Sequence, residues 1–248
     1  TGSYTAEDVR FLLKPMAMQN TPVHLKGLLI QSGEKHYSEL LTHESLPTPA
    51  YVQLFHQALA LNQQRMAHDL LRLAKQIVTT RAQGITLVSL ARAGTPIGVL
   101  LKHILKRYYK MDARHYSVSI IRDIGLDANA LRYIISKHHP GTLVFVDGWT
   151  GKGVIARQLA ESLRVFAIDT GVVIPAELYV LADLSGSATV AATSDDYLIP
   201  SCILNATVSG LVSRTVLDKS TAATDFHGCV YYHDYEAQDL SQYFINSL

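Results

Sequence analysis

The chain has 248 residues, a formal net charge of +1, 48% hydrophobic and 17% charged residues. It can therefore bury a large core and is not disordered, and its balanced charge gives no overall reason to expect nucleic acid or membrane binding. No apolar run reaches the roughly 18–20 residues that span a bilayer. The two cysteines form no C-x-x-C pair, which fits a reducing cytoplasm, and no signal peptide is expected.

The first third of the chain predicts an extension and one long helix. Residues 1–49 are mixed and rich in Pro, His and Ser, which favours a segment that wraps the core. Between residues 49 and 81 the apolar residues recur three to four positions apart, as in an amphipathic helix. We therefore expect an N-terminal extension with its long helix over 1–82 and a core over 83–248, together forming one compact unit.

From residue 85 onwards, strands alternate with helices. Predicted strands cover 85–90, 115–121, 141–146 and 178–182. Predicted helices cover 96–109, 128–137 and 154–163, with Thr95 and Asp127 as N-caps of the first two. This alternation predicts an α/β fold, in which a parallel sheet is flanked by helices and a ligand binds at the carboxyl ends of the strands.

The most informative loop follows the third of these strands. The strand ends in Asp147, and Thr150, Gly151, Lys152 and Gly153 lead into a helix. Backbone N–H groups at a helix N-terminus attract an anion, and an acid beside them can bind sugar hydroxyls or hold Mg²⁺ through water. The segment therefore predicts a sugar-phosphate site. It is not a Walker A loop, because the first glycine of that pattern is absent, and a turn that happens to carry a lysine is the alternative.

Two further loops are expected at the same edge of the sheet. One contains an arginine and a glycine, which suit the recognition and close approach of a polyphosphate; its residues are Ala91, Arg92, Ala93, Gly94 and Thr95. The other begins with Arg122 and Asp123, which form either a mobile catalytic loop or a simple salt bridge. His115 lies on a predicted strand and is expected to be a core histidine.

The 143–153 segment resembles the phosphoribosyl-diphosphate loop of type I phosphoribosyltransferases. Asp147 matches the second acid of that pattern, and Thr150, Gly151 and Lys152 match the turn that binds the 5′-phosphate. The segment departs from the pattern at Val146, which replaces the first acid, and its turn is one residue shorter. The Arg92-Ala93-Gly94 sequence resembles the diphosphate loop of the same family.

A narrower resemblance covers nearly the whole chain. The segments 89–98, 115–123, 147–153, 196–201 and 204–215 occur together in phosphoribosyltransferase-like proteins of bacterial tellurium-resistance and stress gene clusters, a group also labelled StiP cysteine protease. The resemblance implies a role in making a nucleoside-like stress compound. It also implies a chain that continues beyond residue 248 into an RNA-binding region, which would be its route to nucleic acid. A homodimer is compatible with it.

The expected function is Mg²⁺-dependent transfer of a 5-phosphoribosyl group from phosphoribosyl diphosphate to an unknown nitrogen acceptor. In it, residues 150–153 hold the 5′-phosphate, Arg92 stabilises the departing diphosphate, and Arg122 closes over the site. Asp147 binds ribose hydroxyls or Mg²⁺.

Two alternatives stay open. One is a cysteine protease whose nucleophile is Cys202 or Cys229; His227 would share a strand face with the latter. The other is a non-catalytic module that binds a phosphoribosyl ligand without releasing diphosphate.

Overall fold

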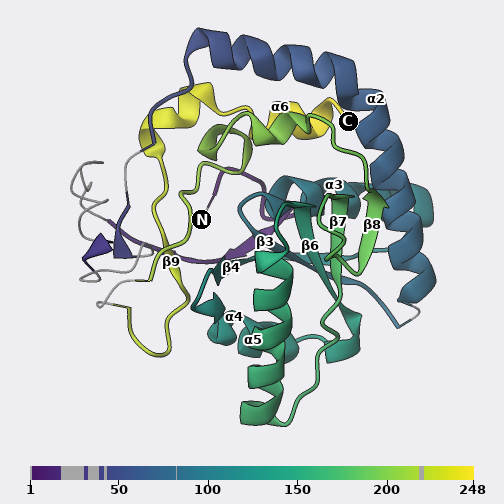
Figure 1. Cartoon of the computed structure of the whole chain (residues 1–248), viewed down its shortest axis with the longest axis vertical. Coiled ribbons are helices and arrows are strands. Elements are labelled where there is room, and N and C mark those ends of the chain that lie inside the picture. Colours follow the sequence, from purple (N-terminus) through teal and green to yellow (C-terminus); the bar gives the residue numbers. More distant parts are fainter. Residues whose placement is uncertain (1, 18–30, 33–38, 42–43, 82, 218–220) are drawn as a thin grey trace.

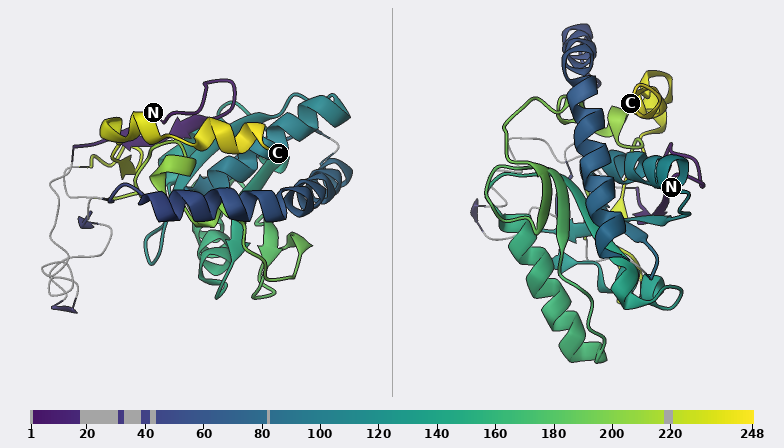
Figure 2. Two further views of the ribbon diagram at one scale, coloured as in Figure 1. Left: turned by 90° about the horizontal axis from the view of Figure 1, so that it is seen from above. Right: turned by 90° about the vertical axis from the view of Figure 1, so that its right-hand side faces the viewer.

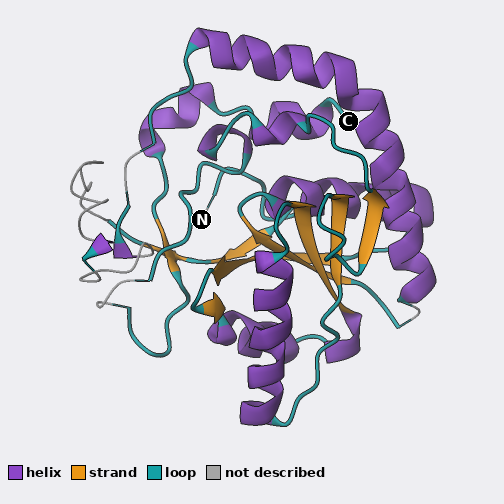
Figure 3. Cartoon of the chain, viewed as in Figure 1, coloured by secondary structure: helices purple, strands orange, loops and turns teal. Residues whose placement is uncertain are grey.

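The computed structural model describes residues 2–17, 31–32, 39–41, 44–81, 83–217 and 221–248. Within them, the centre of the fold is a seven-stranded, largely parallel sheet (Figures 1 and 3). Its order is β1-β4-β3-β6-β7-β8, and β5 pairs antiparallel with β4. The strands are β1 (Arg10–Leu12), β3 (Thr86–Ala91), β4 (Arg114–Ile121), β5 (Gly125–Leu126), β6 (Leu143–Thr150), β7 (Leu178–Asp183) and β8 (Val190–Thr193). A small second sheet pairs β2 (Lys14–Pro15) with β9 (Gly228–Cys229).

Helices cover both faces of the large sheet (Figure 1). One face carries α2 (Pro49–Thr80) and α3 (Gly94–Tyr109), and the other carries α4 (Ala128–Ile135) and α5 (Val154–Thr170). Successive residues of β6 point to opposite faces, so Val144 and Val146 join the α2/α3 core while Phe145 joins the α4/α5 core. Most residues of the central strands are therefore apolar, as expected for a sheet buried on both faces.

The last helix, α6 (Ser241–Asn246), packs against α2, and both views of Figure 2 show the C-terminal segment beside it. The ring of Tyr243 lies edge-on to that of His56, with centroids 5.2 Å apart, and Phe244 packs 6.1 Å from Phe55. The C-terminal segment is thus part of the α2/α3 core. No helix among the described residues has the length and apolar character needed to cross a membrane.

The α/β fold predicted from the sequence is confirmed, and so is the long helix at 49–81. Asp127 is the N-cap of α4, where its Oδ1 accepts from Asn129 N at 2.9 Å and from Ala130 N at 3.0 Å. The N-cap prediction for Thr95 is wrong, because α3 begins at Gly94 after Ala93. The Thr95 hydroxyl is instead buried against Ser117 Oγ, 2.8 Å away on β4.

Several elements extend beyond their predicted limits. β6 continues past Val146 to Thr150, because Asp147, Trp149 and Thr150 pair in register with β7. α5 runs to Thr170 rather than 163. The predicted wrapping of residues 1–49 is seen at β1, which adds a strand beside β4; residues 18–30, 33–38 and 42–43 lie outside the described part. The division at residue 82 stays a prediction.

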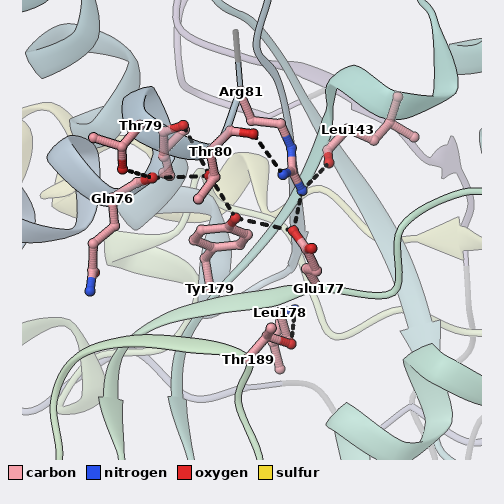
Figure 4. Close-up of polar contacts among 10 residues, drawn as sticks. Gln76, Thr79, Thr80, Arg81, Leu143, Glu177, Leu178, Tyr179 and Thr189 are labelled. Atoms are coloured by element: carbon pink, nitrogen blue, oxygen red, sulfur yellow. Dashed lines mark hydrogen bonds and ion pairs between the residues drawn. The ribbon is translucent and has the colours of Figure 1, made fainter.

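Arg81 anchors the end of α2 at the edge of the sheet where β6 and β7 begin (Figure 4). It forms an ion pair with Glu177, and its Nη2 donates to the Leu143 carbonyl at 3.5 Å. Tyr179 donates from its hydroxyl to the same Glu177 carboxylate at 3.2 Å. Because this network lies at the amino ends of β6 and β7, we expect it to stabilise the fold without touching a ligand.

Replacing Arg81 with alanine should lower the free energy of unfolding by about 2–4 kcal/mol, because the side chain, 8% exposed, loses its packing beside the Tyr179 ring as well as its ion pair with the half-exposed Glu177. Arg81→Met should lose less than half as much, because it keeps an apolar stem near the Tyr179 ring. Urea unfolding of both variants measures the difference. Two equal losses would show that the ion pair, rather than the packed stem, holds α2 in place.

Candidate functional site

The predicted phosphate loop forms one side of a pocket of about 200 Å³ at the carboxyl end of β6. Arg122 reaches the pocket from the turn after β4, and Asp147 and Lys152 reach it from β6 and the following turn. Parallel strands place the loops that follow them at one edge of a sheet, which is why residues distant in sequence meet here. The other lining residues are Trp149, Thr150, Gly151, Gly153, Val154, Ile155, Ala156 and Leu178. Asp123 does not line the pocket; its N–H donates to Gln158 Oε1 at 3.0 Å.

The turn into α5 depends on glycine. Gly153 precedes the helix with a φ of +70°, and a Cβ there would lie 3.0 Å from both Ser187 Cβ and the Arg157 guanidinium. Gly153 is the N-cap residue of α5 and has no side chain with which to cap the helix. The first turn of α5 therefore presents backbone N–H groups at the pocket.

Asp147 has an unusual acidity for an aspartate. Burial raises its pKa to about 7, although the Gly148 N–H donates to Oδ1 at 2.8 Å and opposes the shift. A carboxyl in this state loses its proton near neutral pH and gains most from a nearby cation. Strongly shifted groups in a pocket are typical of functional sites.

The hydroxyl of Thr150 is already hydrogen-bonded within the protein. It donates to Asp183 Oδ1 and accepts from Ser185 N at 3.4 Å. Asp183 also accepts from Ser187 N at 3.1 Å and from Ala188 N at 3.0 Å. Burial by itself would raise the pKa of Asp183, but the hydrogen bonds from Thr150, Ala188 and Ser187 outweigh it and hold the pKa below the usual value. The hydroxyl of Thr150 is therefore not available to donate to a phosphate. Sequence reasoning missed Asp183, whose signal was an acid at a strand end, as at Asp147.

The predicted diphosphate loop touches the end of β6. A Cβ on Gly94 would lie 2.4 Å from the Val146 carbonyl oxygen and 3.1 Å from Asp147 Cα, so only glycine fits there. Gly148 approaches Ala93 from the other side, with its ideal Cβ 3.4 Å from the Ala93 oxygen. The Ala91–Arg92 peptide bond is cis. Because Gly94 and Gly148 allow these close approaches, the two predicted loops lie directly against each other.

Arg92 points into the protein rather than into the phosphate pocket. Its guanidinium forms an ion pair with Glu44 and donates to Asn205 Oδ1 at 3.2 Å and to the Val212 carbonyl at 3.3 Å. It lines a second pocket of about 140 Å³, which we call the Cys202 pocket. Its residues are Arg92, Ala93, Pro96, Trp149, Ser201, Cys202, Leu204, Asn205, Val208 and Ser209.

The two cysteines lie in opposite environments. Cys229 is fully buried on β9, and burial raises its pKa to about 12. Cys202 is exposed, although partial burial still raises the pKa of its thiol. His227 places Nδ1 2.8 Å from Ser119 Oγ and donates its backbone N–H to Asp127 Oδ2 at 2.7 Å. Among the hydrogen bonds of the described residues, none joins a histidine to either sulfur.

His115 is a core residue, as expected. Its Nδ1 lies 2.9 Å from the Asp8 carbonyl and its Nε2 lies 2.9 Å from Ser89 Oγ. Burial lowers its pKa to about 3. In the described part of the chain, no three His, Cys, Asp or Glu side chains are placed to hold a metal together. The roles predicted for the site residues in catalysis and phosphate binding stay predictions.

The comparisons with known proteins agree with the narrower sequence resemblance. A family model described as "Tellurite-like stress resistance cysteine protease StiP" matches residues 2–248. The Acinetobacter baylyi protein named cysteine protease StiP is 44% identical over 257 residues, which cover 100% of this chain and 66% of that protein. The chain thus spans less than two thirds of the length of this relative.

The similar solved structures include two phosphoribosyltransferases. The Helicobacter pylori xanthine-guanine-hypoxanthine enzyme has a TM-score of 0.37 at 20% identity, over 55% of this chain and 84% of that one. The Trypanosoma cruzi hypoxanthine enzyme has a TM-score of 0.38 at 13% identity, over 52% of this chain and 77% of that one. With scores this low, the fold class rests on the strand order described above.

Proposed function

This chain belongs to the family of the tellurite-like stress resistance cysteine protease StiP. For this member of the family, we propose that it binds phosphoribosyl diphosphate and transfers the phosphoribosyl group to a nitrogen acceptor. The observation that carries the proposal is the pocket in which Arg122, Asp147 and Lys152 line the start of α5. Two cations and a helix N-terminus suit a phosphate, and a carboxylate beside them suits ribose hydroxyls.

The 5-phosphate would bind in the turn before α5. The N–H groups of Gly151 to Val154 donate to its oxygens, and the Lys152 ammonium supplies a point charge. Arg122 is exposed at the mouth of the pocket, where it can pair with the same phosphate and exclude water. The phosphate is thereby held at one end while the reacting carbon faces Asp147.

The diphosphate would lie against the Ala91–Thr95 loop, beside the start of α3. In the reaction the bond between C1 of ribose and the diphosphate oxygen breaks, and its electron pair leaves with the diphosphate. The acceptor nitrogen then bonds to C1 and gives its proton to solvent. Asp147 stabilises the positive charge that develops on the sugar. Arg92 reaches the diphosphate only if the phosphate oxygens replace the carboxylate of Glu44, to which it is paired.

Mg²⁺ fits this site as an ion carried by the diphosphate. The described residues offer no cluster of protein ligands, and Asp147 is the carboxylate that lines the pocket. Asp147 would hold the ion through water, since Mg²⁺ retains several waters and prefers substrate phosphates as ligands. When bound, the ion shares the negative charge of the leaving diphosphate.

Proteolysis is the second candidate function, because the A. baylyi relative is named a cysteine protease. Cys202 is the better candidate nucleophile, since it is exposed and lines a pocket whereas Cys229 is fully buried. A histidine would still have to approach the Cys202 sulfur to act as its base.

Diphosphate release from phosphoribosyl diphosphate tests the transferase proposal, with water as the slow acceptor. We expect release by the wild-type chain that EDTA abolishes, and no cleavage of denatured casein. Casein cleavage that disappears in Cys202→Ser, without diphosphate release, would establish the protease function instead. Binding of ribose 5-phosphate without any diphosphate release would make the chain a binding module.

A further inference from the structure

A cavity of about 320 Å³ lies between the segment that leads into α2 and a segment that follows β8. It is lined by residues 44–48 and 203–207 together with Tyr51 and Tyr235, and we call it the Glu44 pocket. It shares no lining residue with the phosphate pocket. It adjoins the Cys202 pocket at Leu204 and Asn205, which line both. The Glu44 pocket is therefore a separate site beside the arginine of the predicted diphosphate loop.

Glu44 supplies the charge of this pocket. All the residues that line it are described, and none of them is Lys, Arg, His or Asp. The Oε1 atom of Glu44 pairs with Arg92, and its Oε2 accepts from the Ala206 N–H at 3.3 Å. A carboxylate oxygen can accept more than one hydrogen bond, so Oε2 has capacity for a further donor. The pocket thus favours a cation over an anion.

The Glu44 pocket also contains a buried hydroxyl without a partner. Thr207 is 2% exposed and lines the pocket, and its Oγ1 makes no hydrogen bond to any described residue. It follows Ala206, whose N–H donates to Glu44. Leaving a buried hydroxyl unsatisfied is unfavourable, and a ligand that carries N–H donors would satisfy it.

Most of the remaining wall is apolar. Leu46, Pro47 and Ile203 supply aliphatic surface, and Tyr51 adds an exposed aromatic ring, whose face attracts organic cations. A hydrated metal ion would need several oxygen ligands, whereas this wall offers one carboxylate. The chemistry fits a ligand with one ammonium group on an apolar body.

The ion pair between Arg92 and Glu44 joins the two adjoining pockets. Arg92 lines the Cys202 pocket, Glu44 lines its own, and both side chains are mostly buried. An anion that takes Arg92 alone leaves Glu44 without a counter-charge, and a cation that takes Glu44 alone does the same to Arg92. When both ligands bind, each charge keeps a partner. An anion and a cation should therefore strengthen each other's binding.

We propose that the Glu44 pocket binds an organic ammonium ion, and that this ligand releases Arg92 from Glu44 so that Arg92 can bind the diphosphate. The ammonium ion would pair with Glu44 and donate to the Thr207 hydroxyl. The release of Arg92 rests on the proposed function, because that function places a diphosphate at the Ala91–Thr95 loop. The ammonium site stands on the Glu44 pocket alone.

The ammonium site is tested with 2-phenylethylamine and its neutral counterpart 2-phenylethanol, in calorimetry at about pH 7, where the amine is protonated. The amine should bind at least about tenfold more tightly than the alcohol, because it adds a charge-assisted hydrogen bond. Glu44→Gln should remove this preference while keeping an oxygen for Arg92. Failure of the amine to bind, or equal affinities of amine and alcohol for the wild-type chain, would overturn the site.

Thr207→Val should weaken amine binding about three- to tenfold, because it removes the hydroxyl that accepts from the ammonium. Ser201→Ala is the matched control. It removes another buried hydroxyl without a partner, which lines the Cys202 pocket and not the Glu44 pocket, so amine affinity should not change. Equal losses in the two variants would overturn the assignment of Thr207.

The release of Arg92 is tested by the coupling between the two ligands. Saturating 2-phenylethylamine should strengthen the binding of phosphoribosyl diphosphate with Mg²⁺ about tenfold, and phosphoribosyl diphosphate should strengthen amine binding by the same factor, since coupling is reciprocal. Ribose 5-phosphate, which lacks the diphosphate, should change less than about twofold. No gain for phosphoribosyl diphosphate, or an equal gain for ribose 5-phosphate, would overturn the release of Arg92.

The two proposals fail separately. If phosphoribosyl diphosphate does not bind the wild-type chain, the proposed function fails, while the comparison of amine and alcohol still decides the ammonium site. Inorganic diphosphate then tests the release of Arg92. Its affinity should rise about tenfold in Glu44→Gln, because the carboxylate that competes for Arg92 is gone. Unchanged or undetectable affinity in that variant would overturn the release.

Discussion

Replacing Lys152 with alanine should weaken the binding of phosphoribosyl diphosphate about 10- to 100-fold. Its exposed ammonium lies in the turn before α5, beside backbone N–H groups that attract the same phosphate. A charge-assisted hydrogen bond contributes about 1.5–3 kcal/mol, which sets the expected range. Isothermal calorimetry with and without Mg²⁺ measures the change. Ribose 5-phosphate should lose a similar factor, because Lys152 contacts the 5-phosphate and not the diphosphate.

Lys106→Ala is the control for this experiment. Lys106 is an exposed lysine in the last turn of α3, at the opposite end of that helix from the Ala91–Thr95 loop. Its loss removes the same charge without touching the pocket, so the affinity should not change. Equal effects of the two substitutions would mean that overall charge, rather than the turn at 151–153, attracts the ligand.

Replacing Asp147 with asparagine should stabilise the protein at alkaline pH. The pKa of Asp147 is raised from 3.8 to about 7, so the native state keeps a proton that the unfolded state has lost. Stability therefore falls as the pH rises from about 4 to 7, and the full penalty, on the order of 4 kcal/mol, applies above pH 7. Asparagine removes this penalty and can still accept from the Gly148 N–H.

Urea unfolding at pH 5 and pH 8 measures this effect. The gain from Asp147→Asn should be largest at pH 8 and less than half as large at pH 5. Asp169→Asn, at an exposed site on α5, is the matched control that removes the same charge away from the pocket. An Asp147→Asn gain that is the same at both pH values would contradict the raised pKa.

The raised pKa of Asp147 also predicts a pH dependence of binding. Mg²⁺-dependent binding of phosphoribosyl diphosphate should strengthen as the pH rises through 7, because the bound cation stabilises the ionised carboxylate.

The free-energy cost of ionising Asp147 explains why this carboxyl is useful near the carboxyl end of β6. A carboxylate that burial destabilises interacts more strongly with a cation or a developing positive charge than a hydrated one does. Asp183, at the end of the neighbouring strand, is the contrast. Its carboxylate is satisfied by Thr150, Ser187 and Ala188 and therefore holds the loop in shape. Two acids on neighbouring strands thus have different tasks, set by their surroundings.

The sequence alone was sufficient to predict the parallel sheet and the charged residues of one pocket. Apolar runs alternating with helical periodicity required a parallel sheet, and such a sheet places the loops after its strands at one edge. Arg122, Asp147 and Lys152 therefore could be grouped before any coordinates were known. Asp127 was equally predictable, because a capping bond joins residues two and three positions apart.

Only the tertiary structure decided which polar groups remain available to a ligand. Arg92 pairs with Glu44 and Asn205, which are 48 and 113 residues away along the sequence. The Thr150 hydroxyl donates to Asp183. Burial likewise separates Cys229 from the exposed Cys202, and the packing of β6 places Trp149 between two pockets. Periodicity and capping are local properties that a sequence displays directly. The partners of a polar side chain depend on which distant segments pack beside it, and that is fixed only when the chain folds.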